Sequence, residues 1–278
     1  MSASPALTVA VALDQARAAG LDRVDRDVLM GALLGRDRAW LLIHDDHPLS
    51  PAQAARWSDW CARRAAGVPV AYLTGQHEFH GLLLQVTPDV LDPRPDTETL
   101  VDWALERLAA LGGAAPTVFD LGTGSGAIAL AIQHRHPKAR VGAVDRSAAA
   151  LAVARANGER LGLDIDWRQG SWFEPMTGLR VDLIVSNPPY IRPDDPHLAD
   201  LRHEPREALV ADEDGLADLR TLIAGAPAHL RPGGWLLLEH GHDQADAVAA
   251  IFEAAGWHEI GHRLDLGGHR RCTGARRP

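Results

Sequence analysis

A glycine-rich loop at residues 120–126 is the first feature whose residue types and spacing can do chemistry. The run Asp120-Leu-Gly122-Thr123-Gly124-Ser125-Gly126 follows a short apolar stretch typical of a strand and precedes a helical pattern. Glycines let a backbone approach a ligand closely, and the first N–H groups of a helix are free donors. The loop alone is compatible with a tight strand-to-helix turn or with a site for NAD, FAD or S-adenosylmethionine.

Acidic residues on either side of this loop narrow the choice of ligand. Asp145 ends the next expected strand, where a carboxylate can accept both hydroxyls of a ribose. The alternative is a cap for the following helix, a role that Ser147 could also fill. Asp120, just before the glycines, suits a ligand with positive charge, such as the sulfonium or amino group of S-adenosylmethionine. The pattern therefore favours methyl transfer over hydride transfer.

The segment Asn187-Pro188-Pro189-Tyr190 follows an apolar run that reads as a buried strand. Two prolines end strand pairing and fix the backbone, so a plain turn is one interpretation. In open α/β sheets, however, ligands bind at the carboxyl ends of the strands, which is where this segment is expected.

Amide methylation needs groups of this kind. An amide or exocyclic NH₂ is a poor nucleophile because its lone pair is delocalised. If two acceptors hold the two N–H groups, the nitrogen can be oriented toward a methyl donor. Asn187 offers a side-chain carbonyl, Pro188 offers a backbone carbonyl on a rigid frame, and Tyr190 offers a flat apolar face.

From residue 96 onward, strand and helix patterns alternate, which predicts a doubly wound α/β sheet. The expected elements are strands at 117–121, 140–144, 166–169, 181–186 and 235–239, helices at 127–134, 148–161, 216–230 and 245–255, and two further strands within 257–273.

Residues 1–73 have helical patterns only. The first helix is expected to bury Leu7, Val11, Leu13 and Ala18, and Ser50-Pro51 is expected to open a third helix. A hairpin turning at His80-Gly81 and three prolines (Pro88, Pro93 and Pro95) follow. We therefore expect a helical substrate-recognition domain at 1–73, a hairpin and proline linker at 74–95, and a catalytic domain at 96–278.

Composition sets outer limits on function. The chain has 28 basic and 37 acidic side chains, a net charge of −9. This argues against binding nucleic acid by general phosphate neutralisation. The chain has two cysteines but no CxxC pair, and its sequence shows no signal-peptide pattern and no apolar run long enough to span a bilayer. These features predict a cytoplasmic protein without a membrane partner.

Taken together, the motifs resemble those of the bacterial peptide-chain-release-factor glutamine N5-methyltransferases, the PrmC/HemK family. The segments that carry the resemblance are Arg94-Pro-Asp-Thr-Glu98, the loop 120–126, Asp145, the segment 187–190, Glu204-Pro205, Asp214-Gly215 and Leu236-Leu-Leu-Glu-His240-Gly. The Asn-Pro-Pro-Tyr motif alone also occurs in adenine-N6 and other amino methyltransferases, whereas its combination with the first and last segments is more selective.

The resemblance implies a Rossmann-like S-adenosylmethionine-dependent methyltransferase fold, with S-adenosylhomocysteine as product. Gly122 to Gly126 would wrap the methionine part of the cofactor, Asp145 would hold the ribose, and Trp172 would lie against the adenine. Asn187 to Tyr190 would clamp the glutamine amide of a Gly-Gly-Gln motif in class 1 release factors. Ser171 stands where many relatives have an acidic residue, so an adenine contact from this position is not expected.

Other signals favour no second function. The two histidines of His77-Glu78-Phe79-His80 are three apart in an expected hairpin, which does not suit a zinc-peptidase site. The tail 262–278 holds five arginines against one aspartate, and a solvated basic end is favoured over contact with RNA or a partner.

Three alternatives remain open at this point. A ribosomal-protein glutamine methyltransferase would share the clamp, and a DNA or RNA amino methyltransferase would need a basic groove and a target-recognition domain. A module that binds the methyl donor without catalysis is disfavoured by the intact Asn187–Tyr190 segment.

Overall fold

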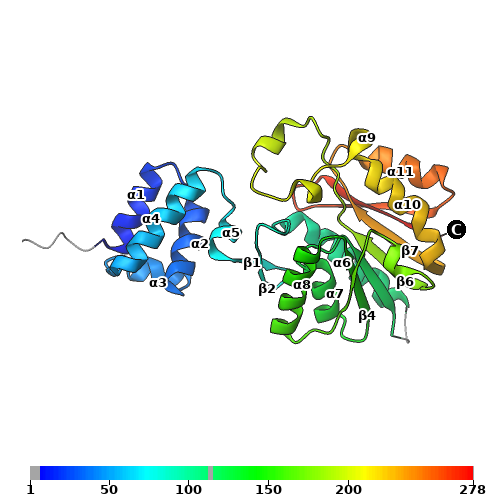
Figure 1. Cartoon of the computed structure of the whole chain (residues 1–278), viewed down its shortest axis with the longest axis horizontal. Coiled ribbons are helices and arrows are strands. Elements are labelled where there is room, and N and C mark those ends of the chain that lie inside the picture. Colours follow the sequence, from blue (N-terminus) through cyan, green and yellow to red (C-terminus); the bar gives the residue numbers. More distant parts are fainter. Residues whose placement is uncertain (1–6, 112–114, 278) are drawn as a thin grey trace, which may run out of the picture. The chain divides into compact units, whose positions relative to one another are not determined.

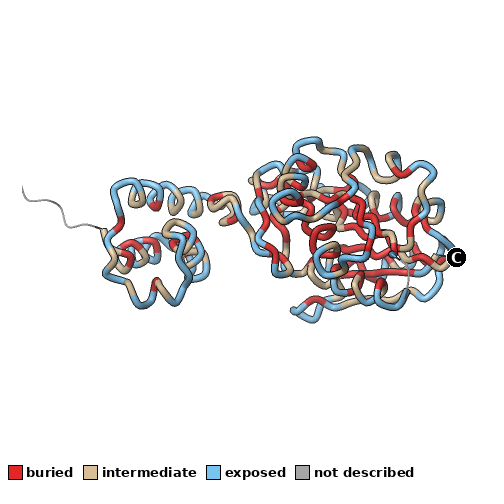
Figure 2. The backbone as a smooth tube through the Cα atoms, turned by 90° about the horizontal axis from the view of Figure 1, so that it is seen from below, coloured by how far each residue is buried: buried red, intermediate tan, exposed pale blue. Residues whose placement is uncertain are grey.

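In the computed structural model of the chain, the residues described are 7–111 and 115–277. The chain divides into two compact units, Met1–Gln76 and His77–Pro278. Buried stretches, red in Figure 2, run through the interior of each unit. None of the helices in these two ranges is long and apolar enough to cross a membrane.

The first unit is helical. It contains α1 (Val9–Ala18), α2 (Arg23–Leu34), α3 (Arg38–Ile43), α4 (Pro51–Ala65) and α5 (Val70–Thr74). The first four begin at capping side chains, and Ser50 forms a capping box with Gln53 ahead of Pro51. Such caps satisfy N–H groups that a helix leaves free at its start. The short helices α3 and α5 were not predicted.

The buried face of α1 differs from the expected one. Val9, Ala12 and Ala16 are buried, whereas Val11 is 48% exposed and Ala18 is exposed. Val9, Ala12 and Ala16 also recur at helical spacing, and alanine is small enough to lie on either face. Leu7 and Leu13 are partly buried and pack against the core of this unit, so the expected stripe was wrong at Val11 and Ala18.

A hairpin of β1 (Gln76–Phe79) and β2 (Leu82–Gln85) lies at the start of the second unit, with only its first residue assigned to the first. His80 and Gly81 form its turn with φ of 50° and 82°, as in the two-residue turns that match strand twist. Phe79, Leu82 and Leu84 are buried in the same core cluster as Leu100, so the hairpin packs with this unit.

A seven-stranded sheet forms the body of the second unit, with the order β5-β4-β3-β6-β7-β9-β8. Its strands are β3 (Thr117–Leu121), β4 (Arg140–Asp145), β5 (Asp166–Gln169), β6 (Val181–Ser186), β7 (Leu230–Glu239), β8 (His258–Leu264) and β9 (Arg270–Arg276). The first five are parallel, and β9 runs antiparallel to both of its neighbours. This confirms the predicted Rossmann-like class, including the two strands at the end of the chain.

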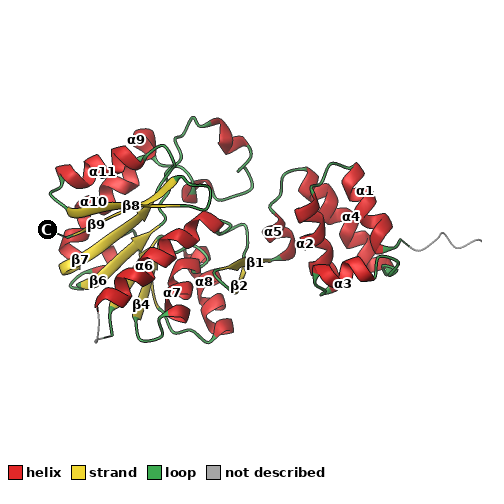
Figure 3. Ribbon diagram, turned by 180° about the vertical axis from the view of Figure 1, so that it is seen from behind, coloured by secondary structure: helices red, strands yellow, loops and turns green. Residues whose placement is uncertain are grey.

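Helices cover both faces of the sheet (Figures 1 and 3). They are α6 (Glu98–Leu111), α7 (Ala127–Arg135), α8 (Ala148–Leu161), α9 (Asp212–Gly215), α10 (Ala217–His229) and α11 (Ala245–Ala254). Side chains of α6 and α7 share one core cluster with alternate residues of the strands, and those of α10 and α11 share another. Consecutive strand residues point to opposite faces, which explains this division.

The strand order reverses between β3 and β6, because β3 leads to β4 on one side whereas β6 leads to β7 on the other. In such sheets the crevice beyond the carboxyl ends at this reversal is where ligands bind. The glycine loop follows β3, Asp145 ends β4, and Asn187 follows β6.

Candidate active site

The glycine loop between β3 and α7 is tied to the neighbouring strand. Gly122 and Thr123 both donate their backbone N–H to the Val144 carbonyl, at 2.8 and 3.0 Å. Gly122 has φ of 75°, and a Cβ there would lie 3.3 Å from the Trp172 ring. The position therefore needs glycine both for its left-handed backbone and for the close ring.

Asp145 fastens the other side of the loop. One carboxylate oxygen accepts the N–H of Gly124 at 2.8 Å, and the other accepts the N–H of Ser147 at 2.9 Å. Ser147 itself caps α8 by accepting from Ala150. Because the cap is supplied by Ser147, the Asp145 carboxylate is left facing a pocket, where burial raises its pKa against the effect of these two hydrogen bonds.

Asp120 lies behind the loop and is fully buried. Its Oδ2 accepts the Thr123 hydroxyl at 2.6 Å, while Oδ1 has no hydrogen-bond partner in the described part of the chain. Burial raises the pKa of Asp120 to about 7. In this geometry Asp120 holds the loop through Thr123.

Asn157, which sequence reasoning did not single out, also supports the loop from behind. Its amide group donates to the carbonyls of Ser125 and Gln85, both at 3.0 Å, and its oxygen accepts the Gln85 N–H at 2.7 Å. The side chain is fully buried, so it joins the glycine loop to the hairpin. An asparagine within a helical pattern carries no local signal for such a role.

Trp172 has an unusual backbone. Its φ of 45° lies in the left-handed region, which is costly for a bulky residue and tends to be kept where it serves a site. The indole ring lies against Gly122. Burial raises the pKa of Asp218, at the start of α10, while the charge of Arg146 and the Trp172 side chain oppose the rise.

The Asn187–Tyr190 segment contains two carbonyl oxygens that receive no hydrogen bond from the described residues. The Asn187 side chain donates from Nδ2 to the Thr97 hydroxyl oxygen at 3.3 Å. Within the described residues, neither its carbonyl oxygen nor the Pro188 carbonyl accepts a hydrogen bond. Pro188 is buried and Asn187 is half-buried and lines the pocket, so both carbonyl oxygens are available to a ligand with two N–H groups.

Tyr190 is held at both ends. Its hydroxyl donates to Glu239 Oε1 at 3.3 Å, and its backbone carbonyl accepts from Gln244 at 3.0 Å. Burial raises the pKa of Tyr190. Glu239 ends β7 beside this segment, and burial raises its pKa to about 7, while the hydroxyls of Thr97 and Tyr190 and the charge of Arg271 oppose the rise.

One pocket of about 780 Å³, measured to its open mouth, brings part of this set together. The expected residues that line it are Gly122, Gly124, Asp145, Trp172, Asn187 and Pro189. The expected residues that do not line it are Asp120, Thr123, Ser125, Gly126, Pro188 and Tyr190.

Further lining residues were not predicted. Asp89 comes from the segment before α6 and Glu207 from the loop after the Asn187–Tyr190 segment, whereas Arg146 follows β4 and Asp218 lies at the start of α10. With Asp145, the lining therefore carries four carboxylates and one guanidinium. The pocket suits a ligand with positive charge.

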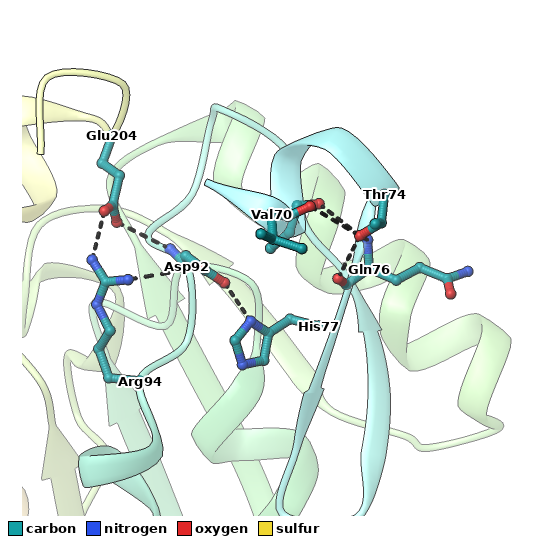
Figure 4. Close-up of polar contacts among 8 residues, drawn as sticks. Val70, Thr74, Gln76, His77, Asp92, Arg94 and Glu204 are labelled. Carbon is teal, nitrogen blue, oxygen red and sulfur yellow. Dashed lines mark hydrogen bonds and ion pairs between the residues drawn. The ribbon is translucent and has the colours of Figure 1, made fainter. Parts of the chain in front are cut away.

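A buried ion pair joins these two walls (Figure 4). Arg94 donates to Glu204 Oε1 at 2.5 Å, and the other Glu204 oxygen accepts the Asp92 N–H at 3.4 Å. Asp92 in turn lies 2.6 Å from His77. The Glu204 side chain is 2% exposed, so Arg94 neutralises a carboxylate that water does not reach.

The histidine pair His77 and His80 and the basic tail, for which the sequence favoured no second function, pair with carboxylates of the second unit. His77 faces Asp92, whereas His80 lies 3.0 Å from Asp102, so the histidines are held by different carboxylates. Arginines of the basic tail pair with acidic residues of the second unit. These pairs are Arg263 with Glu106, Arg270 with Asp246, Arg271 with Asp96 and Asp265, and Arg276 with Glu259.

A sheet of this order, with a glycine loop after its first parallel strand and an Asn-Pro-Pro-Tyr segment after its fourth, defines a Rossmann-like methyltransferase. Residues 99–203 match the methyltransferase small domain family, and residues 8–75 match the PrmC N-terminal domain family.

Relatives extend the match to nearly the whole chain. The release factor glutamine methyltransferase of Bordetella pertussis is 52% identical over 92% of this chain and 95% of its own length. That of Burkholderia pseudomallei is 48% identical over 97% of both chains, and that of Pseudomonas aeruginosa 46% over 90% and 91%. The chain belongs to the release factor glutamine methyltransferase family.

Solved structures agree on the fold. A methyltransferase from Pyrococcus furiosus gives a TM-score of 0.53 at 17% identity, covering 82% of this chain and 98% of that one. The T. thermophilus 16S rRNA N2 G1207 methyltransferase, in complex with AdoMet and guanosine, gives 0.55 at 20% identity over 73% and 50%. At these identities the likeness concerns the fold alone.

Proposed function

We propose that this chain transfers a methyl group from S-adenosylmethionine to the side-chain amide nitrogen (N5) of the glutamine in the GGQ motif of class 1 peptide chain release factors. The observation that carries the proposal is the pair of unfilled acceptors at Asn187 and Pro188, beside the pocket below the glycine loop. The names of the relatives support the same substrate.

The pocket fits the cofactor in shape and charge. Gly122 and Gly124 allow close approach along one wall, Trp172 offers an aromatic face, and the Asp145 carboxylate retains free lone pairs for ribose hydroxyls. The excess of carboxylates in the lining complements a sulfonium cation. When bound, S-adenosylmethionine supplies an electrophilic methyl group and leaves as S-adenosylhomocysteine.

The chain's own contribution is to position the amide. The carbonyl oxygens of Asn187 and Pro188 each accept one N–H of the substrate NH₂, which turns the nitrogen lone pair toward the methyl group. The N–CH₃ bond forms with that lone pair as the S–CH₃ bond breaks and its electron pair stays on sulfur. The methylated nitrogen is strongly acidic and gives its proton to water, so the step needs no general base. Positioning can supply roughly 7–11 kcal/mol of such a barrier.

We further propose that residues 1–73 bind the release factor away from its GGQ motif and that 74–95 link this domain to the catalytic domain at 96–278. We also propose that the chain acts in the cytoplasm and has neither a stable nucleic-acid partner nor a membrane partner.

Labelled S-adenosylmethionine tests the substrate directly. The chain is incubated in parallel with a purified release factor, a ribosomal protein and DNA, and label transfer is counted. We expect label in the release factor. Label in the ribosomal protein or in DNA, with none in the release factor, would overturn the assignment.

A further inference from the structure

Gln244 is a buried residue that no sequence motif singled out and that does not line the pocket. It stands directly before α11 and is 9% exposed. A side chain at this position often bonds the free N–H groups of its own helix, but the Gln244 side chain makes no such bond. It is directed instead at backbone groups from three other places in the chain, so its burial serves contacts beyond the helix.

Both ends of the Gln244 amide match their partners. Its NH₂ group donates to the carbonyl of Tyr190 at 3.0 Å and to that of Asp214 at 3.3 Å. Its oxygen accepts the Gly241 N–H at 2.8 Å. A reversed amide would place its oxygen against two carbonyls and its NH₂ group against an N–H. The three partners therefore fix the orientation of the side chain.

A strained turn packs against the same Tyr190 carbonyl. Glu213, Asp214 and Gly215 have φ of 54°, 58° and 81°, a left-handed run that is costly for the first two residues. A Cβ at Gly215 would lie 2.2 Å from the Tyr190 carbonyl oxygen and 2.7 Å from Gln244 Nε2. Strained backbone of this kind clusters at functional sites, where the surrounding contacts maintain it. The turn and Gln244 together enclose the Tyr190 carbonyl.

Tyr190 anchors the end of the segment that carries the two unfilled acceptors. Its N–H donates to the Leu209 carbonyl at 3.2 Å, and its own carbonyl is held by Gln244. Pro188 and Pro189, which precede it, have no N–H with which to bond neighbouring backbone. The direction of the Pro188 carbonyl therefore depends on the end of β6 on one side and on Tyr190 on the other.

We propose that Gln244 is a positioning residue which, by holding the Tyr190 carbonyl, keeps the Pro188 carbonyl directed at the substrate amide. This inference rests on the proposed function, in which the Pro188 carbonyl accepts one N–H of the glutamine NH₂. Gln244 lies 54 positions beyond Tyr190 in the chain and outside the pocket. Its loss should therefore slow methyl transfer and leave cofactor binding intact.

Two substitutions separate the donor side of the Gln244 amide from its acceptor side. Gln244→Glu keeps an oxygen for the Gly241 N–H but loses the donors to the Tyr190 and Asp214 carbonyls, whereas Gln244→Met loses both sides. Each should lower kcat for the release factor on the order of 10- to 100-fold, because small misplacements of reacting groups cost that much. KM should change much less. A wild-type kcat in Gln244→Glu would overturn the proposal, whether or not Gln244→Met is slow.

Phe252→Leu is the matched control for a loss of stability without a change at Tyr190. Phe252 is fully buried in the same helix, where its ring packs edge-on against Trp257. Hydrogen exchange at increasing urea should show the second unit of this variant to be destabilised, while its kcat stays within about twofold of wild type. Affinity for S-adenosylmethionine, measured by calorimetry, should stay within about twofold in all three variants because neither position lines the pocket. Equal losses of kcat in the control and in the Gln244 variants, or a matching loss of cofactor affinity, would refute the inference.

Local hydrogen exchange tests the contact apart from catalysis. The N–H groups of Tyr190 and Ile191 both donate to the Leu209 carbonyl, at 3.2 and 2.9 Å. Relative to the core of the second unit, both should exchange faster in Gln244→Glu than in wild type, and Phe252→Leu should show no such difference. Unchanged relative exchange in Gln244→Glu would refute the inference, whatever the activity of the wild type. Failure of the wild type to methylate the release factor would instead refute the proposed function.

Discussion

The ion pair between Arg94 and Glu204 should respond very unequally to loss of either partner. The Glu204 side chain is 2% exposed and that of Arg94 is 34% exposed. Arg94→Met leaves a buried carboxylate whose remaining bond is a long one of 3.4 Å from the Asp92 N–H. Removing one partner of a buried pair in this way costs about 3–5 kcal/mol.

Loss of the acidic partner should cost less. In Glu204→Gln the guanidinium can turn toward water, and Asp92 Oδ2 lies 3.8 Å away to balance its charge. We expect about 1.5 kcal/mol, the lower end for a hydrogen bond to a charged group. The double variant of Arg94→Met with Glu204→Leu removes both charges and should return to within about 1 kcal/mol of wild type.

Because the chain has two compact units, a single unfolding curve would mix them. Hydrogen exchange read by mass spectrometry at increasing urea gives the free energy of opening for each segment separately. The amides of 189–211 and of the second-unit core are the ones to follow, with the first unit as internal control. Equal costs for the two single variants, or a larger cost for Glu204→Gln, would refute the reasoning from burial.

Three further changes have defined outcomes. Asp145→Ala should weaken cofactor binding about 10- to 100-fold by calorimetry while the fold survives, since the lost contacts are one or two hydrogen bonds to a charged group; unchanged affinity would remove Asp145 from the site. Gly215→Ala places a Cβ 2.2 Å from the Tyr190 carbonyl oxygen at φ of 81°, so it should lower both stability and kcat. The control Gly162→Ala, at φ of 66°, meets no atom within 4 Å and should lower stability alone, by about 1–2 kcal/mol. The pKa of Asp120 rises from 3.8 to about 7 on folding, so the stability it contributes is complete below about pH 4 and is lost as the pH rises to about 7. Relative to wild type, Asp120→Asn should therefore be more stable at pH 7 than at pH 4 by up to about 4 kcal/mol, read by hydrogen exchange in the second unit. A difference that does not change with pH would show that folding does not raise the pKa of Asp120.

Sequence patterns predicted the body of the fold because they are local. Alternation of apolar strands with helical stripes gave all seven strands, and the loop at 120–126, Asp145 and Asn187 were each expected at a strand's carboxyl end, where the structure has them. The stripe on α1 was wrong at Val11 and Ala18 because Val9, Ala12 and Ala16 recur at an equally helical spacing and are the ones buried.

The side-chain contacts around the site could not be predicted, because they join segments that are distant in the sequence. Thr97 and Asn187 are 90 residues apart, and Arg94 and Glu204 are 110 apart. No periodicity links such pairs, since they meet only through the order of the strands. Thr97 and Glu239 lie in segments that carried the family resemblance, yet their burial and their bonds to the clamp are visible only in three dimensions.

The measurement that tests the central claim most directly is methyl transfer by wild type and Asn187→Ala to a release factor, with S-adenosylmethionine affinity determined on the same samples. If Asn187 clamps the glutamine amide, mass spectrometry should find the methyl group on the glutamine of the GGQ motif with wild type. Asn187→Ala should then lose most of its turnover while its cofactor affinity stays nearly intact. Equal loss of cofactor binding and turnover, or a methyl group on another residue, would contradict the account.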